Sequence, residues 1–315
     1  MVDPAGKLRV LAIAAEPPEV RPGEPVAASA LVVIHPRFGL PSDLDGELGG
    51  RLVGTPTPRG LSVQWRACRL TDAASPPVPC GLVDGRLTTD EQLLEALPGP
   101  ATRLVAPGGD DLPYTLVLTL IAADAALPGG AAACHEQAVQ RGGVSPDPDH
   151  CVIAVKRVKV AATDRPNHNP TLAGYYLGTA EPLRELGLGP ADYPLLTADL
   201  DDRQRPQLIL AAERAADAVE AEPDPQHREL ERPETLGISF FTTAGTLEAG
   251  RGSFLDLGCT QEPAQCPQLL RASVGWQPPA ARAAVEAPDG VVFFFAVLRD
   301  DRGGTSFRSG HALAR

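Results

Sequence analysis

The stretch Val291-Val-Phe-Phe-Phe-Ala-Val-Leu-Arg-Asp-Asp-Arg-Gly-Gly-Thr-Ser-Phe307 decides the fold class of this 315-residue chain. It begins with an uninterrupted apolar run, which has the length and composition of a β-strand buried on both faces. Charged residues and two glycines follow, and such residues favour a turn. Thr305 then begins a second β-prone run. The stretch therefore predicts a buried strand, a turn and a last strand.

The same alternation of short apolar runs and turns extends over the whole chain. Its 33 prolines and 31 glycines lie scattered between the runs rather than concentrated in one segment. This distribution is typical of an all-β protein with many turns. We expect further strands at residues 7–15, 26–34, 61–68, 114–122, 151–160, 195–200, 207–212, 236–247 and 272–279.

Short helical insertions are expected at two places, and a third is left open. Residues 89–97 have the composition of a short helix, in which Thr89 caps the N-terminus with Gln92 three residues later. A proline-glycine-proline sequence follows and ends it. Residues 134–141 predict one or two helical turns. The acidic, alanine-rich residues 213–222 fit either a helical turn or an exposed loop.

The sequence Asp164-Arg-Pro-Asn-His-Asn-Pro170 interrupts the strand pattern and predicts a domain linker. Its prolines and asparagines favour extended and turn conformations, and its shortness predicts a fairly stiff junction. The chain length suits two domains of ordinary size, each with its own core. We therefore expect a first domain with loop insertions at residues 1–165 and a second domain at residues 166–315.

The composition excludes several classes of partner. The formal net charge is −12, and lysine occurs only at Lys7, Lys156 and Lys159. A chain without a cationic cluster is poorly suited to nucleic acid or to an anionic membrane surface, because both carry negative charge that needs neutralisation. No segment has the length of a membrane span. We expect an export signal, now removed, ahead of Val2, and a lipid anchor would sit on that N-terminus.

Six cysteines form three pairs that are close in sequence. The pairs are Cys68 with Cys80, Cys134 with Cys151, and Cys259 with Cys266. Each pair brackets a loop, which indicates local disulfides and an oxidising compartment. Zinc is the alternative for the second pair, because His135 and His150 adjoin its cysteines. Neighbouring residues of an extended chain point to opposite sides, however, so these ligands converge poorly on one ion.

The sequence contains no complete catalytic motif, and we predict a non-enzymatic protein that needs no cofactor and no metal. His135-Glu136 begins an HExxH motif, but Val139 stands where the second histidine is required. Phosphate-binding loops, dinucleotide fingerprints and nucleophile elbows do not occur. Acidic clusters suit calcium, which needs several oxygen ligands, although solvated turns are the simpler interpretation. The acidic residues in question are Asp110, Asp111, Asp199, Asp201, Asp202, Asp300 and Asp301.

Several stretches resemble repeats of bacterial surface proteins. The sequence PPEVRPGEPV at 17–26 is similar to the link between the first two strands of Ig-like and PKD-like domains. SFFTTAGTL at 239–247, SVGWQPP at 273–279 and the closing hairpin resemble PKD-type repeats. Trp65, in the third predicted strand, resembles the core tryptophan of Ig-like folds. As a whole, the chain resembles uncharacterised cell-envelope lipoproteins of myxobacteria and their relatives.

The resemblance implies an all-β fold of two tandem immunoglobulin-like (PKD-like) β-sandwich domains. It also implies an exported protein of the periplasm, outer membrane or cell surface, acting as a structural spacer or binding module for a protein or envelope partner. Two alternatives stay open, namely a subunit of a larger extracellular or envelope assembly and an accessory carbohydrate-binding module. Sugar binding is disfavoured because both tryptophans fall in strand patterns.

Overall fold

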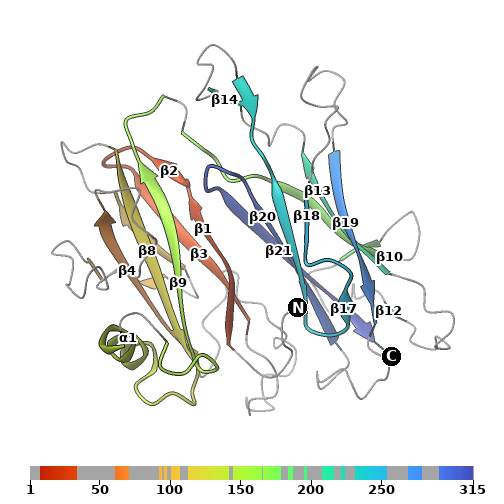
Figure 1. Ribbon diagram of the computed structural model, residues 1–315, viewed down its shortest axis with the longest axis horizontal. Coiled ribbons are helices and arrows are strands. Elements are labelled where there is room, and N and C mark those ends of the chain that lie inside the picture. Colours follow the sequence, from red (N-terminus) through yellow and green to blue (C-terminus); the bar gives the residue numbers. More distant parts are fainter. Residues whose placement is uncertain are drawn as a thin grey trace. The chain divides into compact units, whose positions relative to one another are not determined.

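The chain consists mostly of β-strands in several sheets, with one short helix, over the residues that the structure describes (Figure 1). The computed structural model describes residues 8–33, 61–70, 92–93, 96–97, 101–106, 113–141, 145–164, 166–178, 184–186, 195–196, 208–215, 221–223, 231–253, 269–278 and 291–314. The all-β prediction is confirmed. Contacts divide the chain after Asn169 into an N-terminal and a C-terminal unit, and the bounds 1–165 and 166–315 remain predictions.

The N-terminal unit contains two sheets and a helix. Its elements are β1 (Arg9–Glu16), β2 (Glu19–Val20), β3 (Pro25–Val33), β4 (Ser62–Leu70), β5 (Gln92–Leu93), β6 (Ala96–Leu97), β7 (Ala101–Val105), β8 (Tyr114–Ala123), α1 (Gly130–Gln140) and β9 (Cys151–Val160). The first sheet has the order β1-β3-β7-β6 and the second the order β2-β9-β8-β4-β5. Pro17 and Pro18 separate β1 from β2, and because proline cannot donate a backbone hydrogen bond, the chain leaves the first sheet here.

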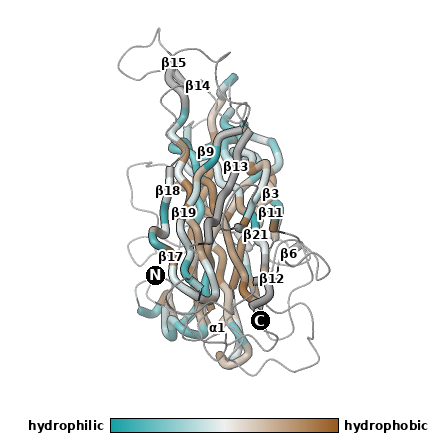
Figure 2. Tube along the Cα trace, turned by 90° about the vertical axis from the view of Figure 1, so that its right-hand side faces the viewer, coloured by the Kyte–Doolittle hydropathy of each residue, from teal (hydrophilic) through white to brown (hydrophobic). Residues whose placement is uncertain are grey.

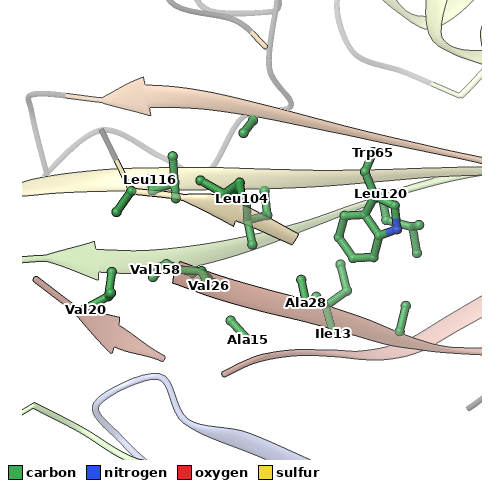
Figure 3. Close-up of a cluster of buried hydrophobic side chains, with 14 of the residues drawn as sticks. Ile13, Ala15, Val20, Val26, Ala28, Trp65, Leu104, Leu116, Leu120 and Val158 are labelled. Carbon is green, nitrogen blue, oxygen red and sulfur yellow. The ribbon is translucent and has the colours of Figure 1, made fainter. Parts of the chain in front are cut away.

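One hydrophobic core lies between the two sheets of the N-terminal unit (Figure 3). Leu116, Leu118 and Leu120 alternate along β8 and contribute to this core from the second sheet. Trp65 on β4 is 1% exposed, and its ring points toward Ala28 on β3 of the first sheet. The interpretation of Trp65 as a core residue is therefore confirmed.

The C-terminal unit is also built from two main sheets. Its elements are β10 (Leu172–Gly178), β11 (Arg184–Glu185), β12 (Leu195–Leu196), β13 (Leu208–Ala215), β14 (Ala221–Pro223), β15 (Glu231–Pro233), β16 (Gly237–Thr242), β17 (Thr246–Leu247), β18 (Arg251–Ser253), β19 (Leu269–Gln277), β20 (Val291–Arg299) and β21 (Thr305–Ala314). The orders are β11-β10-β13-β19-β17 and β12-β21-β20-β16-β18, and β14 pairs with β15 alone. The hairpin predicted from the opening stretch is present as β20 and β21.

The two units share a pattern of strand pairing. In each, a short strand runs parallel to the last strand, as β2 does with β9 and β12 with β21. The last strand is followed across the sheet by β8 and β4 in the N-terminal unit and by β20 and β16 in the C-terminal unit. The opposing sheets contain the rows β1-β3-β7 and β10-β13-β19. Over these strands, the second half of the chain therefore repeats the order of the first.

Aromatic side chains fill the core of the C-terminal unit. Trp276 is fully buried, meets the ring of Phe294 edge-on at 4.8 Å, and donates a hydrogen bond from Nε1 to the carbonyl of Ala244 at 2.9 Å. Tyr175 stacks on Phe240 with their ring centroids 6.3 Å apart. Figure 2 shows hydrophobic residues running along the strands and hydrophilic residues toward the turns, as buried two-sheet cores require.

The helix predicted at 89–97 and the helical turn left open at 213–222 are not present in the described residues. Residues 92–93 and 96–97, within the helix predicted at 89–97, form β5 and β6, which pair with β4 and β7 respectively. Main-chain hydrogen bonds to these two strands outweigh the helix propensity, because so short a helix is marginal in water. The start of the 213–222 segment likewise continues β13 along β19 as far as Ala215, rather than forming a helical turn or a loop.

Residues of the predicted linker bind back to the N-terminal unit. The amide of Asn167 donates a hydrogen bond to Oε2 of Glu19 at 3.0 Å, and Nζ of Lys159 lies 2.7 Å from Oε1 of the same side chain. Glu19 is 3% exposed and Asn167 is fully buried. The side-chain amide of Asn169 donates to the carbonyl of Ala15 at 2.6 Å. These bonds fix the start of the linker along β1 and β2.

Candidate functional site

A disulfide joins helix α1 to the start of β9. The Sγ atoms of Cys134 and Cys151 are 2.02 Å apart and their Cα atoms 5.8 Å. Both residues are buried with Ile121 and Ala123 of β8 in a small cluster on the face of the second sheet away from the main core. This predicted pairing is confirmed. The zinc alternative is wrong for the oxidised chain, because sulfurs bonded to each other are not thiolate ligands.

Glycines and a serine from another strand set the start of α1. Gly129 and Gly130 have positive φ angles of 84° and 59°, and a Cβ on Gly130 would lie 2.8 Å from Oγ of Ser62 on β4. That hydroxyl accepts a hydrogen bond from the amide of Ala131 at 3.1 Å, and so satisfies one of the amides left open at a helix N-terminus. The helix therefore starts before the predicted 134–141, at a glycine pair that is typical of a turn.

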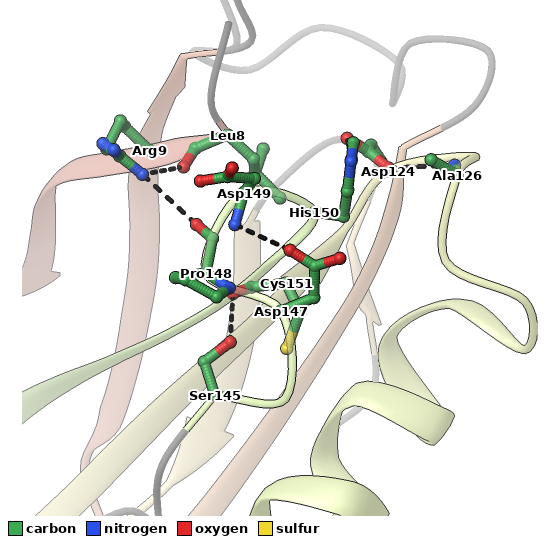
Figure 4. A network of polar contacts seen from close by, with 10 residues as sticks. All are labelled: Leu8, Arg9, Asp124, Ala126, Ser145, Asp147, Pro148, Asp149, His150 and Cys151. Carbon is green, nitrogen blue, oxygen red and sulfur yellow. Dashed lines mark hydrogen bonds and ion pairs between the residues drawn. The ribbon is translucent and has the colours of Figure 1, made fainter. Parts of the chain in front are cut away.

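Polar groups order the loop that leads into the disulfide (Figure 4). Nδ1 of His150 lies 2.8 Å from Oδ2 of Asp124, whose other oxygen accepts a hydrogen bond from the amide of Ala126 at 2.9 Å. Oδ1 of Asp147 accepts a hydrogen bond from the amide of Asp149 at 3.1 Å. The hydrogen bond to Asp124 outweighs burial and, with the charges of Asp124, Asp147 and Asp149, raises the pKa of His150 above 6.5.

The raised pKa of His150 predicts a pH-dependent stability. Because the folded protein favours the protonated imidazole, this contribution is complete below the ordinary pKa of 6.5 and is lost as the pH rises through the raised value. We expect the free energy of unfolding to fall between pH 6 and about pH 8.5, and to fall less in His150→Gln. Urea titrations of both proteins at the two pH values measure the difference. Equal slopes in the two proteins would contradict the prediction.

The other predicted disulfides are described only in part. Cys68 on β4 is 1% exposed and is disulfide-bonded. Its expected partner, Cys80, lies outside the described residues, as do Cys259 and Cys266. The pairings of Cys68 with Cys80 and of Cys259 with Cys266 therefore remain predictions.

Asp300, in the acidic pair at the last hairpin, has a structural role. Oδ1 of Asp300 accepts hydrogen bonds from the amide of Arg302 at 2.9 Å and from the amide of Gly304 at 2.6 Å, which closes the turn between β20 and β21. Asp301 is exposed beside it. Within the part of the chain that the structure describes, no cluster of acidic residues, histidines or cysteines could hold a metal ion. The candidate calcium ligands Asp110, Asp111, Asp199, Asp201 and Asp202 lie outside that part.

A groove of about 850 Å³ opens in the C-terminal unit. It is lined by residues 237–242 of β16, 245–248 around β17, 250–252 around β18, and Arg299 at the end of β20. β17 and β18 are the outermost strands of different sheets. After β16 the chain forms β17 at the edge of the opposite sheet and then β18 beside β16. This part of the chain lines the groove.

Positive charge gathers on one wall of the groove. Arg251 on β18 lies opposite Ser239 on β16, and Arg299 on β20 lies opposite Gly237 on β16. Nη1 of Arg299 donates a hydrogen bond to Oγ of Ser239 at 3.4 Å. Burial of its guanidinium and the nearby charge of Arg251 lower the pKa of Arg299. The two cations are therefore close enough to repel each other.

A carboxylate lines the groove from the β17–β19 sheet. The side chain of Glu248 covers Gly275 on β19, where an added Cβ would come within 2.3 Å of Oε2. Gly275 lies between Val274 and Trp276, which face the core, so Glu248 lies on the outer face of its own sheet.

Sequence reasoning did not identify this groove. Glu248 and Arg251 belong to no motif, and Arg299 was assigned only to the closing hairpin. The predicted strand at 236–247 also continued through the turn that forms one end of the groove. The glycines at 245, 250 and 252 are the available signal, because closely spaced glycines in a strand pattern indicate bends and close backbone approach.

None of the helices among the described residues is long and apolar enough to cross a membrane. No protein-family model matches the chain, and no curated protein resembles it in sequence.

Proposed function

We propose that the chain is an exported, non-enzymatic protein in which two tandem immunoglobulin-like (PKD-like) domains act as a binding or spacer module of the cell envelope. Strand order supports the Ig-like assignment. An Ig-like sandwich places strands A, B, E and D in one sheet and strands C, F and G in the other, with C′ beside C in some types. In the N-terminal unit, β1, β3, β7 and β6 correspond to A, B, E and D.

The opposing sheet supports the same assignment. There β9, β8, β4 and β5 correspond to G, F, C and C′, so buried Trp65 lies on the strand that carries the core tryptophan of Ig domains. The C-terminal unit has equivalent rows in β10-β13-β19-β17 and β21-β20-β16-β18. It departs from the pattern in one respect. The strand in the position of D is β17, and it comes earlier in the sequence than β18, the strand in the position of C′.

The bond between Cys134 and Cys151 is the observation that carries the proposal of export. Structural disulfides form and persist in oxidising compartments, whereas cytosolic thiols are kept reduced. The bond cross-links a helix to a strand within a β-domain, as expected of a stabilising rather than a catalytic disulfide. We place the protein in the periplasm, on the outer membrane or at the cell surface, with a lipid anchor on its N-terminus as the attachment.

A spacer or binding role fits two units built around separate cores. In such folds, contacts to partners come from loops and strand edges carried on a rigid scaffold. The accessory sugar-binding alternative is weakened, because Trp65 and Trp276 are 1% and 0% exposed and provide no surface for stacking. A subunit of a larger envelope assembly remains the alternative that a measurement of mass must decide.

Export is tested by producing the chain with a signal peptide in a bacterial periplasm and alkylating it after denaturation without reductant. We expect none of the six cysteines to react, and the mass to shift by six alkyl groups only after reduction. Six reactive thiols in the native material would overturn the proposal. Light scattering during size-exclusion chromatography then distinguishes a 33.0 kDa monomer, expected of a spacer or binding module, from an oligomeric assembly subunit.

A further inference from the structure

We propose that the groove of the C-terminal unit binds a carboxylate group through Arg251, Arg299 and the hydroxyl of Ser239. The proposal rests on the proposed role as a binding module and gives that module a site and a ligand class. The proposal does not depend on the compartment in which the protein works. If the disulfides are intact but no carboxylate binds, the proposal for the groove is wrong and the proposal of export stands.

Arg251 provides a positive charge in the groove that has no neutralising partner among the described residues. Its side chain is exposed and lines the groove. Within the described part of the chain, no hydrogen bond or ion pair neutralises it. An exposed arginine is ordinarily paired or simply solvated, but Arg251 lies beside a second guanidinium, that of Arg299, in a concave surface. Each of two neighbouring cations raises the electrostatic free energy of the other, and an anion between them offsets this repulsion.

The positions of the two arginines leave room for that anion. Arg251 and Arg299 flank β16 from its two neighbouring strands, opposite Ser239 and Gly237 respectively. Gly237 has no side chain, and a Cβ added there would meet no atom within 4 Å. The wall between the arginines is therefore open, and Ser239 offers a hydroxyl within reach of Arg299. A planar guanidinium presents paired N–H donors that match the two oxygens of a carboxylate.

Phe241 favours an apolar body on the ligand. It alternates with Ser239 and Gly237 along β16, so it lies on the same face of the strand as they do, and it is half-buried in the lining. We therefore expect a carboxylate attached to an apolar or ring-shaped body.

Benzoate is the probe, because it combines a carboxylate with a flat apolar ring. In an NMR titration of the full chain, we expect saturable shifts of the Nε–Hε signals of Arg251 and Arg299. Arg251→Gln should weaken binding at least about tenfold, because a hydrogen bond to a charged group is lost. The affinity of Arg251→Lys for benzoate should lie between those of the wild type and Arg251→Gln, since lysine keeps the charge but lacks the paired N–H donors of arginine. Arg308→Gln, an exposed arginine of β21 outside the groove, is the matched control and should bind as the wild type does.

Benzamide and inorganic phosphate separate the ligand chemistry from unspecific effects. Neutral benzamide should bind at least about tenfold more weakly than benzoate. Tighter binding of phosphate than of benzoate would overturn the assignment to a carboxylate. Equal weakening by Arg308→Gln, or no saturable shift with benzoate, would overturn the site itself. Glucuronate and N-acetylphenylalanine then distinguish the two natural sources of such a group, an acidic polysaccharide and a peptide C-terminus.

Discussion

Replacing Cys134 and Cys151 together with alanine is expected to lower the free energy of unfolding of the N-terminal unit by about 3 kcal/mol. The two cysteines are 17 residues apart in sequence, and opening a loop of that size returns conformational entropy to the unfolded chain. Alanine is the appropriate replacement, because both sulfurs are fully buried and a serine hydroxyl would need a partner there. Urea denaturation followed by hydrogen-exchange mass spectrometry measures the loss in the N-terminal unit separately from the C-terminal unit.

The location of the effect distinguishes cross-linking from a general loss of packing. Helix α1 contacts the second sheet through the disulfide cluster and the Ser62 hydrogen bond, so its amides should exchange faster in the double variant. The amides of β3, in the opposite sheet, should be protected until the whole unit unfolds. Ser62→Ala is the matched control, since it removes the other attachment of α1 and should cost only about 1 kcal/mol. An unchanged free energy in the double alanine variant would show that the disulfide has no role in stability.

Sequence reasoning predicted the buried strands well where apolar residues dominate. The runs at 114–122 and 291–298 became β8 and most of β20, because side chains that cannot face water fix both the strand and its burial. The run at 151–160 became β9, but most of its residues are only half-buried. The stretch at 172–178, Leu-Ala-Gly-Tyr-Tyr-Leu-Gly, was missed although it forms β10. Small residues and glycines weaken its apolar pattern. Its hydrogen bonds to β13 stabilise the strand, and the local sequence does not reveal them.

The groove was out of reach for a different reason. Arg251 and Arg299 are far apart in sequence and come together only because β18 and β20 flank β16 in one specific register. A shift of one residue in either pairing would turn one arginine to the other face of the sheet. That register depends on the connections between the strands. The glycines at 245 and 250 indicate bends there but do not specify which residues pair. Cysteines that are close in sequence could be paired from their spacing alone. The contact of Ser239, Arg251 and Arg299 could not be predicted in this way, because they lie on three different strands.

Replacing Glu19 with alanine is expected to destabilise the N-terminal unit by about 2 kcal/mol and to loosen the start of the linker. The carboxylate is the acceptor for the amide of Asn167, which is fully buried, and loss of an acceptor for a buried N–H costs about 1–3 kcal/mol. Lys159 contributes less, because its side chain is 60% exposed and is stabilised by water in the absence of the ion pair. Glu19→Gln keeps an acceptor for Asn167 and should cost about half as much.

Hydrogen exchange and limited proteolysis at residues 163–169 report the effect within the predicted linker. Asn169 and Thr163 also bond to the N-terminal unit, through Ala15 and Arg21 respectively, so the segment should fray around Asn167 first rather than detach as a whole. Glu136→Gln is the matched control, because Glu136 is an exposed glutamate of α1 in the same unit. If Glu19→Ala left the exchange and the cleavage of 163–169 as in the wild type, the stiffness predicted for this junction would have to come from its prolines alone. If Glu19 holds the segment as we predict, the loss of this one side chain loosens it while both cores stay intact.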